Sequence, residues 1–191
     1  IKNDSVALIL GDNFFYGQSL SKKLIECTKL KKGAKVFLHP VKNPSLYGIA
    51  TLKSNNSITK LVEKPKKSKS NLAITGLYFF DNSVVKYSQS LKPSKRKELE
   101  IIDLLNKYKT KNKLKAEYIG RGGTWLDTGS IDDFYDASNF VSTIEKRQGL
   151  KIACLEEIAL SKKWINKNNI VKAINFYGNN QYSKYLKNLL K

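Results

Sequence analysis

Short apolar runs alternate along this chain with stretches in which apolar residues recur every three or four positions. The continuous run at residues 6–10 is typical of a buried parallel strand, and the spacing within residues 19–30 predicts an amphipathic helix. By the same criteria we predict strands over 35–41, 73–80 and 114–119, a β-hairpin over 47–63, and helices over 83–91, 100–108, 131–144 and 181–190. Ser83 is the expected N-cap of its helix. The alternation predicts an α/β sheet with an inserted hairpin.

Two aspartates stand where strands are expected to end. Asp12 follows the first apolar run in A-L-I-L-G-D-N-F-F-Y-G, and Asp127 lies in G-G-T-W-L-D-T-G, within a glycine-rich loop over 120–129. Ligands of open α/β sheets bind beyond the carboxyl ends of the strands, so both carboxylates could face one site. One or two carboxylates plus substrate phosphates suit Mg²⁺. The alternative is that both aspartates are caps. Asp12 would cap a following turn, and Asp127 would cap the helix that begins near residue 131.

Composition narrows the class of protein. The chain has 191 residues, of which 41% are hydrophobic, enough for one substantial core or one domain with an appendage. No stretch approaches the roughly 20 apolar residues of a membrane-spanning helix, and residues 1–7 lack the features of a secretory signal. Cys27 and Cys154 have no metal-ligand spacing, which favours a reducing cytosol and two buried, inert thiols.

The net charge of +19 raises nucleic acid as a partner. Against it, only three of the 35 basic residues are arginine (Arg96, Arg121 and Arg147), and the lysines are spread over the whole chain. Asparagine and isoleucine are also abundant, which indicates a general compositional drift. We therefore expect no nucleic-acid partner. A basic nucleic-acid binder stays an alternative, which a steep salt dependence of DNA affinity would support.

Six segments carry the candidate chemistry: L-G-D-N-F-F-Y-G, P-S-L-Y-G-I-A, L-V-E-K-P, L-A-I-T-G-L-Y-F-F-D, K-E-L-E-I-I-D and W-L-D-T-G. In this order and at these intervals they closely resemble the glucose-1-phosphate thymidylyltransferases, a branch of the sugar nucleotidyltransferases. The tail A-S-N-F-V-S-T-I-E-K-R-Q-G-L-K-I-A-C-L-E-E-I-A looks like this branch rather than its uridylyl or cytidylyl relatives. The resemblance implies a Rossmann-like nucleotide-diphospho-sugar transferase fold with a mixed central sheet. Residues 1–148 would be part of the core, and 149–191 a helical C-terminal extension.

The activity implied is transfer of a thymidylyl group from dTTP to glucose 1-phosphate, giving dTDP-glucose and pyrophosphate. Such enzymes act in the cytoplasm as homotetramers, at the first step of dTDP-rhamnose synthesis. Asp12 and Asp127 would hold Mg²⁺, and Lys64 would pair with phosphate. Because a phosphate monoester is already ionised near neutral pH, the nucleophile needs no general base. The lack of a catalytic histidine or reactive cysteine is therefore expected.

The resemblance also implies a sugar pocket. Glu63 would accept hydrogen bonds from sugar hydroxyls, while Tyr47, Gly48 and the backbone of Ile74 would form its wall, and Tyr78 either reaches the sugar or packs in the core. The alternative for Glu63 and Lys64 is a solvated pair that ends a hairpin strand; for Gly48 and Ile74 it is a plain strand start and a core residue. Trp125 and His39 are predicted to be structural.

Two departures from the family pattern matter. The glycine-rich G-G-x-G-T-R-L loop that cradles the nucleotide phosphates does not occur in this sequence, and Ile102 stands where the family usually carries threonine. We therefore expect the chain to be the C-terminal two-thirds of a longer enzyme, inactive alone. A uridylyltransferase and a non-catalytic sugar- or nucleotide-binding module that begins at Ile1 stay open as alternatives. A glycine-rich loop encoded in frame upstream would favour the enzyme.

Overall fold

The structure is a computed structural model that describes residues 1, 3–94 and 96–191. It divides into two compact units, Ile1–Asp133 and Phe134–Lys191. The division falls inside helix α4 (Ile131–Gln148), whereas the sequence analysis placed the boundary after residue 148. Each unit is described by itself.

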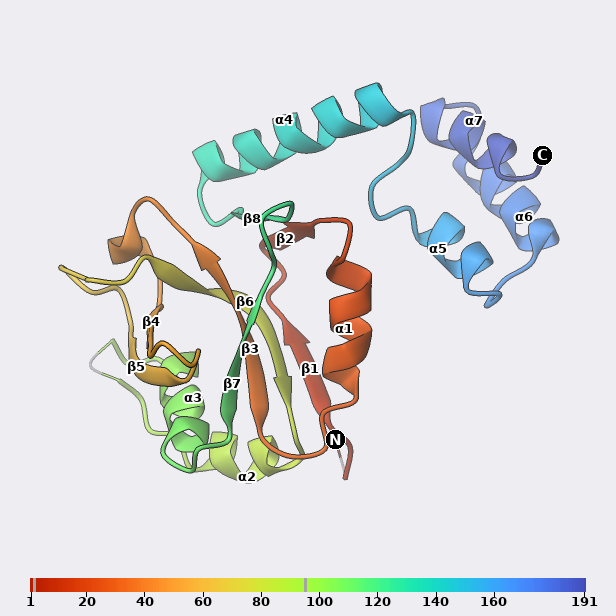
Figure 1. Cartoon of the computed structure of the whole chain (residues 1–191). Helices are drawn as coiled ribbons and strands as arrows, with labels where there is room; N and C mark the ends of the chain where they lie inside the picture. Colours follow the sequence, from red (N-terminus) through yellow and green to blue (C-terminus); the bar gives the residue numbers. More distant parts are fainter. Residues whose placement is uncertain (2, 95) are drawn as a thin grey trace. The chain divides into compact units, whose positions relative to one another are not determined.

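A mixed six-stranded sheet forms the centre of the first unit (Figure 1). Its order is β5 (Ile58–Val62), β4 (Ile49–Leu52), β6 (Leu72–Phe80), β3 (Ala34–Pro40) and β7 (Leu114–Tyr118), with β1 (Val6–Ile9) also paired to β6. β3 and β7 run parallel, and the other pairs of this sheet are antiparallel. The predicted mixed sheet and its β4–β5 hairpin are confirmed.

The strands at the centre are apolar on both faces because each face has its own core. In β3, Val36 and Leu38 belong to a core that includes residues of α2 (Ser83–Gln89) and α3 (Ile101–Lys109). Phe37, between them, belongs to a second core with Cys27 of α1 (Leu20–Thr28). Successive side chains of a strand point to opposite faces, so the continuous apolar run satisfies both cores. Both cysteines are free and buried, as predicted.

The sequence analysis missed a two-stranded ribbon that borders the candidate site. β2 (Asn13–Tyr16) pairs antiparallel with β8 (Thr124–Asp127), where a turn and a glycine-rich loop were predicted. Each strand has four residues and no apolar–polar alternation, and glycines flank both. Pattern analysis has little to detect in such segments.

The prediction for β1 was wrong in its pairing. β1 pairs antiparallel with β6, and Ala7, Leu8 and Ile9 are exposed, although the run was predicted to be a buried parallel strand. Within the described residues β6 is its sheet neighbour. Apolar residues in a strand indicate that it can be buried, but they do not determine which strand it pairs with or in which direction.

A buried aspartate replaces the predicted cap of α2. Asn82 occupies the N-cap position, and the Ser83 N–H donates to Asp81 Oδ1 at 3.0 Å. The same carboxylate accepts from Gly33 N at 2.6 Å and from the Tyr108 hydroxyl at 3.0 Å. Asp81 therefore ties α2, α3 and the start of β3 together, which is why Ser83 is a helical residue and not the cap.

The second unit is helical. α5 (Leu155–Ser161), α6 (Lys167–Tyr177) and α7 (Gln181–Asn188) follow α4, and Cys154, Ile170, Ile174 and Leu186 form their buried core. The helix predicted over residues 181–190 corresponds to α7.

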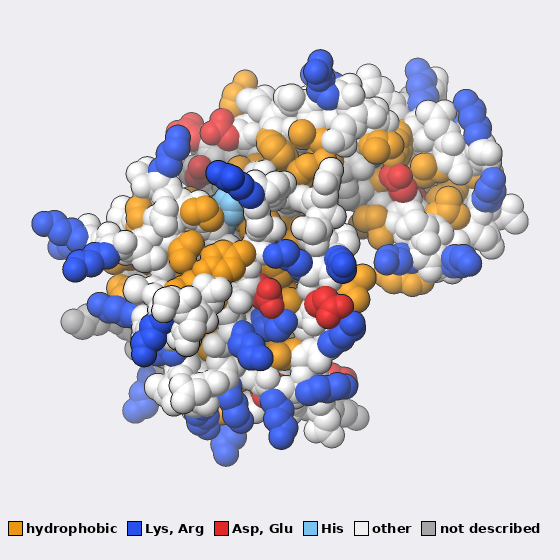
Figure 2. All heavy atoms as spheres, viewed as in Figure 1, with side chains coloured by type: hydrophobic (Ala, Val, Ile, Leu, Met, Phe, Trp, Pro, Cys, Tyr) orange, Lys and Arg blue, Asp and Glu red, His pale blue; other side chains and the backbone are white. Residues whose placement is uncertain are grey.

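Among the described residues, no helix combines the length and apolar character that a membrane crossing requires. On the face drawn in Figure 2, lysine and arginine side chains are scattered among polar and apolar ones.

Candidate active site

The residues singled out by the sequence converge on one pocket of about 200 Å³ in the first unit. They come from the end of β1, the segment before β4, the end of β5, the middle of β6 and the end of β8. The pocket is lined by eight of these predicted residues: Asp12, Tyr47, Gly48, Glu63, Lys64, Ile74, Tyr78 and Asp127. Its lining also includes Asn13, Gly76, Ile102 and Trp125.

The backbone around Asp12 is fastened to the backbone around Asp127. Asn13 and Asp127 are partners in the β2–β8 register, and both the N–H and the hydroxyl of Thr128 donate to the Asp12 carbonyl at 2.8 Å. Two aspartates far apart in sequence therefore stand on adjacent backbone. The missed ribbon is what brings them together.

The charge of Asp12 acts on the carboxylate of Asp127. Burial is the main cause that raises the pKa of Asp127, and the charges of Asp12 and Asp133 add to it, whereas a hydrogen bond from Gly129 N to Asp127 Oδ1 opposes it. The alternative role of Asp127 is therefore met in part: its carboxylate closes an Asx-type turn with Gly129 but does not cap α4. Ser130 caps α4 instead, because its hydroxyl oxygen accepts from Asp133 N at 3.1 Å. Two nearby carboxylates that repel each other favour a bound cation.

The donor set fits a cation that takes part of its coordination from a substrate. Among the described residues no group of three or more histidine, cysteine, aspartate or glutamate side chains could hold a metal. Asp12 and Asp127 offer two hard carboxylates in one pocket. Mg²⁺ is commonly bound in this way, by one or two carboxylates, waters and substrate phosphates.

The opposite wall of the pocket is built from main chain. Ile74 N donates to Gly48 O at 2.7 Å, so the N–H of Ile74 is used inside the protein. A Cβ on Gly48 would lie 3.0 Å from Ile102 Cδ1 and 3.1 Å from Glu63 Oε2. A side chain at position 48 would therefore crowd Ile102 and Glu63. Tyr78 is only 2% exposed, and burial is the main cause that raises its pKa.

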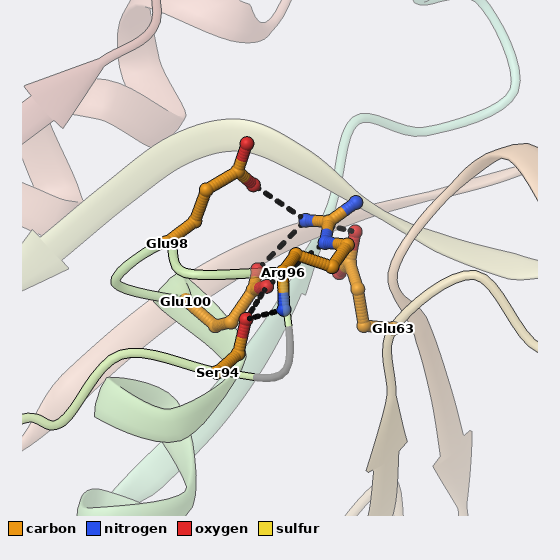
Figure 3. A network of polar contacts seen from close by, with 5 residues as sticks. All are labelled: Glu63, Ser94, Arg96, Glu98 and Glu100. Carbon is orange, nitrogen blue, oxygen red and sulfur yellow. Dashed lines mark hydrogen bonds and ion pairs between the residues drawn. The ribbon is translucent and has the colours of Figure 1, made fainter.

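Glu63 reaches the pocket from a charged cluster that the sequence analysis did not assign (Figure 3). Arg96 forms a two-point pair with Glu100, at 3.1 Å from Nε and 3.0 Å from Nη2. Its Nη2 lies 3.0 Å from Glu98 and 3.9 Å from Glu63. Ser94 donates to Glu100 at 2.8 Å. Burial is the main cause that raises the pKa of Glu63, followed by the charge of Glu100, while Arg96 opposes both.

Lys64 has an unfavourable backbone conformation. Its φ is +40°, in the left-handed region that favours glycine, and Pro65 follows it. The Lys64 N–H donates to Tyr47 O at 3.1 Å, which holds this conformation. Non-glycine residues in such conformations cluster at functional sites, because the surrounding structure must compensate for the strain.

Trp125 does more than pack. It is 8% exposed, and its ring meets Tyr47 edge-on at 5.1 Å and His39 at 6.2 Å between centroids. Its Nε1–H donates to Asn13 Oδ1 at 2.6 Å. Burial lowers the pKa of His39, in keeping with the structural role predicted for it.

A family model and the sequence relatives both place the chain among the nucleotidyl transferases. The model of the nucleotidyl transferase family matches residues 1–144. The chain is 44% identical to a glucose-1-phosphate thymidylyltransferase of Neisseria meningitidis serogroup A, covering 100% of this chain and 66% of the relative. It is 42% identical to one of Mycobacterium tuberculosis, covering 98% and 65%. The chain thus spans slightly less than two thirds of these relatives.

Solved structures agree with the sequence relatives. A Bacillus anthracis protein described as a glucose-1-phosphate thymidylyltransferase, in complex with sucrose, is 38% identical, with a TM-score of 0.64 over 73% of this chain and 55% of that one. A UDP-glucose pyrophosphorylase complexed with UDP-glucose is 25% identical, with a TM-score of 0.65 over 75% and 58%.

Proposed function

The chain belongs to the nucleotidyl transferase family, and we propose that the whole protein transfers a thymidylyl group from dTTP to glucose 1-phosphate, giving dTDP-glucose and pyrophosphate. One observation carries the proposal. Eight residues predicted from five separate segments line a single pocket, in a chain that the thymidylyltransferases of N. meningitidis and M. tuberculosis match over nearly its whole length. Cytoplasmic location and a homotetramer stay predictions.

In this reaction the phosphate of glucose 1-phosphate displaces pyrophosphate from the α-phosphorus of dTTP. An oxygen of glucose 1-phosphate forms a bond to the α-phosphorus of dTTP, and the bond from that phosphorus to the oxygen of the β-phosphate breaks as pyrophosphate leaves. The nucleophile is already ionised, so it gives up no proton. The protein's task is to hold two anions in line against their mutual repulsion.

The lining residues divide this task. The Lys64 ammonium pairs with phosphate as a point charge. Glu63 accepts hydrogen bonds from sugar hydroxyls, and Gly48 lets the sugar approach the main chain. Tyr47 and Tyr78 form apolar walls that limit the orientations of the ring.

Asp12 and Asp127 are the residues that would hold Mg²⁺. When bound, the cation offsets the charge of the phosphates and fixes their orientation.

A uridylyltransferase is the second candidate, since one structural relative is complexed with UDP-glucose. The test is ³¹P NMR of the complete product of the gene that encodes this chain, with glucose 1-phosphate, Mg²⁺ and either dTTP or UTP. We expect pyrophosphate and a sugar-nucleotide signal, formed faster with dTTP. Faster reaction with UTP would favour the second candidate, and no reaction with either would refute the proposed activity.

A further inference from the structure

Asn13 contacts three parts of the pocket at once. Its Oδ1 accepts from Gly76 N at 3.0 Å in β6 and from Trp125 Nε1 at 2.6 Å in β8. Its Nδ2 donates to Asp12 Oδ1 at 2.7 Å. A half-buried amide with partners on both sides is held in one orientation.

The orientation follows from the chemistry of the partners. A backbone N–H and an indole N–H can only donate, so the Asn13 atom that faces both must be the oxygen. The NH₂ group then has to point the other way, toward Asp12. The carboxylate of Asp12 thereby receives a donor whose position it does not itself determine.

The fold makes room for this amide. A Cβ built on Gly76 would lie 2.6 Å from Asn13 Cγ, closer than real Cβ contacts allow. Gly76 lies inside β6, where glycine has no conformational advantage and leaves a strand without a side chain to pack. Glycine is required at position 76 because the side chain of Asn13 approaches the β6 backbone closely there.

Asp12 needs such a donor because its side chain is exposed, whereas its backbone is fixed by Thr128. An exposed carboxylate otherwise samples several rotamers, and the wrong ones direct it away from Asp127. With Asn13 bound to Oδ1, the other oxygen of Asp12 is left for a ligand.

We propose that Asn13 is a positioning residue that fixes the carboxylate of Asp12 through an amide locked by Gly76 and Trp125. That the oriented carboxylate of Asp12 binds a cation rests on the proposed function. Partners in the outer shell of a metal site orient its ligands, and their loss typically weakens metal affinity about 10- to 100-fold.

Two measurements on the complete product of the gene that encodes this chain test the inference. In the metal-free protein, ¹⁵N NMR should show the side-chain NH₂ of Asn13 as a widely split pair, with the proton bonded to Asp12 shifted downfield. Asp12→Ala should abolish that shift. In a Mn²⁺ titration with glucose 1-phosphate present, Asn13→Ala should weaken Mn²⁺ affinity about 10- to 100-fold.

Controls separate positioning from general stability. Tyr108→Phe removes a buried hydroxyl that donates to Asp81, outside the pocket, and should leave Mn²⁺ affinity unchanged. Trp125→Phe keeps an aromatic ring but removes one lock of the amide, so it should weaken affinity in the same direction as Asn13→Ala, by less. If Asn13→Ala does not fold, Trp125→Phe tests the inference in its place.

The outcomes are distinguishable. A folded Asn13→Ala that binds Mn²⁺ like the wild type overturns the inference, as does an Asn13 amide signal that Asp12→Ala leaves in place. If the wild-type chain binds no Mn²⁺, the cation site of the proposed function fails. The amide signal then decides the inference by itself.

Discussion

Replacing Lys64 should separate the stability of the fold from the function of the pocket. Lys64 has φ +40° and precedes Pro65. A non-glycine residue in the left-handed region costs about 1–2 kcal/mol. Lys64→Ala keeps the Cβ and hence the strain, whereas Lys64→Gly relieves it. Glycine returns part of that gain, about 0.5–1 kcal/mol, because the unfolded chain becomes more flexible.

The net result should be a Lys64→Gly protein more stable than Lys64→Ala by about 1 kcal/mol, or roughly 2–4 °C in melting temperature for a chain of this size. Thermal unfolding followed by circular dichroism measures this difference. Both variants lack the ammonium group, so glucose 1-phosphate should bind about 10- to 100-fold more weakly to each, as measured by calorimetry.

Asn56 provides the matched control. It has φ +60° in the β4–β5 turn and does not line the pocket. Asn56→Gly should likewise be more stable than Asn56→Ala, and neither should alter glucose 1-phosphate binding. The reasoning is wrong if Lys64→Gly is no more stable than Lys64→Ala while the Asn56 pair behaves as expected.

Three further predictions concern Asp81, Gly48 and Glu63. Burial would raise the pKa of Asp81, but hydrogen bonds from Gly33, Tyr108 and Ser83 outweigh it and lower the pKa. The stability that Asp81 provides is therefore present above about pH 4 and is lost as the pH falls through its folded pKa. Asp81→Asn should cost about 2 kcal/mol in urea unfolding at pH 7 and flatten the loss of stability at acid pH; equal stability would contradict this. Gly48→Ala should weaken the binding of glucose 1-phosphate with little change in melting temperature, because the methyl group crowds Glu63; unchanged affinity would count against a close approach there. Since the pKa of Glu63 is raised, the affinity for glucose 1-phosphate should begin to fall on acidification at a higher pH than an ordinary glutamate gives, and Glu63→Gln should remove that step.

The sequence predicted most of the sheet because its strands have strong patterns. The apolar strand around Phe37 and the hairpin of β4 and β5 were both identified, and the helical spacing predicted α3. Asp12 and Asp127 were first singled out by their places after predicted strands, and the other six candidate residues came from a family resemblance and not from periodicity. Periodicity alone would not have selected Glu63, which ends an ordinary hairpin strand.

The parts that were missed depend on contacts between distant segments. β2 and β8 are too short to show a pattern, and they form because each supplies the other's hydrogen bonds. Asn13 and Arg96 likewise acquire their roles from partners distant in sequence, Trp125 and Glu63 respectively. The predicted cap of α2 was wrong for the same reason, because the Asp81 carboxylate, bound also by Gly33 and Tyr108, accepts from the Ser83 N–H, and Asn82 occupies the N-cap position.

The central claim is that Asp12 and Asp127 hold one cation together, and a Mn²⁺ titration of Asp12→Asn, Asp127→Asn and the double variant tests it most directly. With glucose 1-phosphate present, each single variant should bind Mn²⁺ more weakly, and the loss in the double variant should be smaller than the sum of the two single losses, because both carboxylates act on the same ion. Single variants that keep wild-type affinity, or losses that simply add in the double variant, would contradict a shared site.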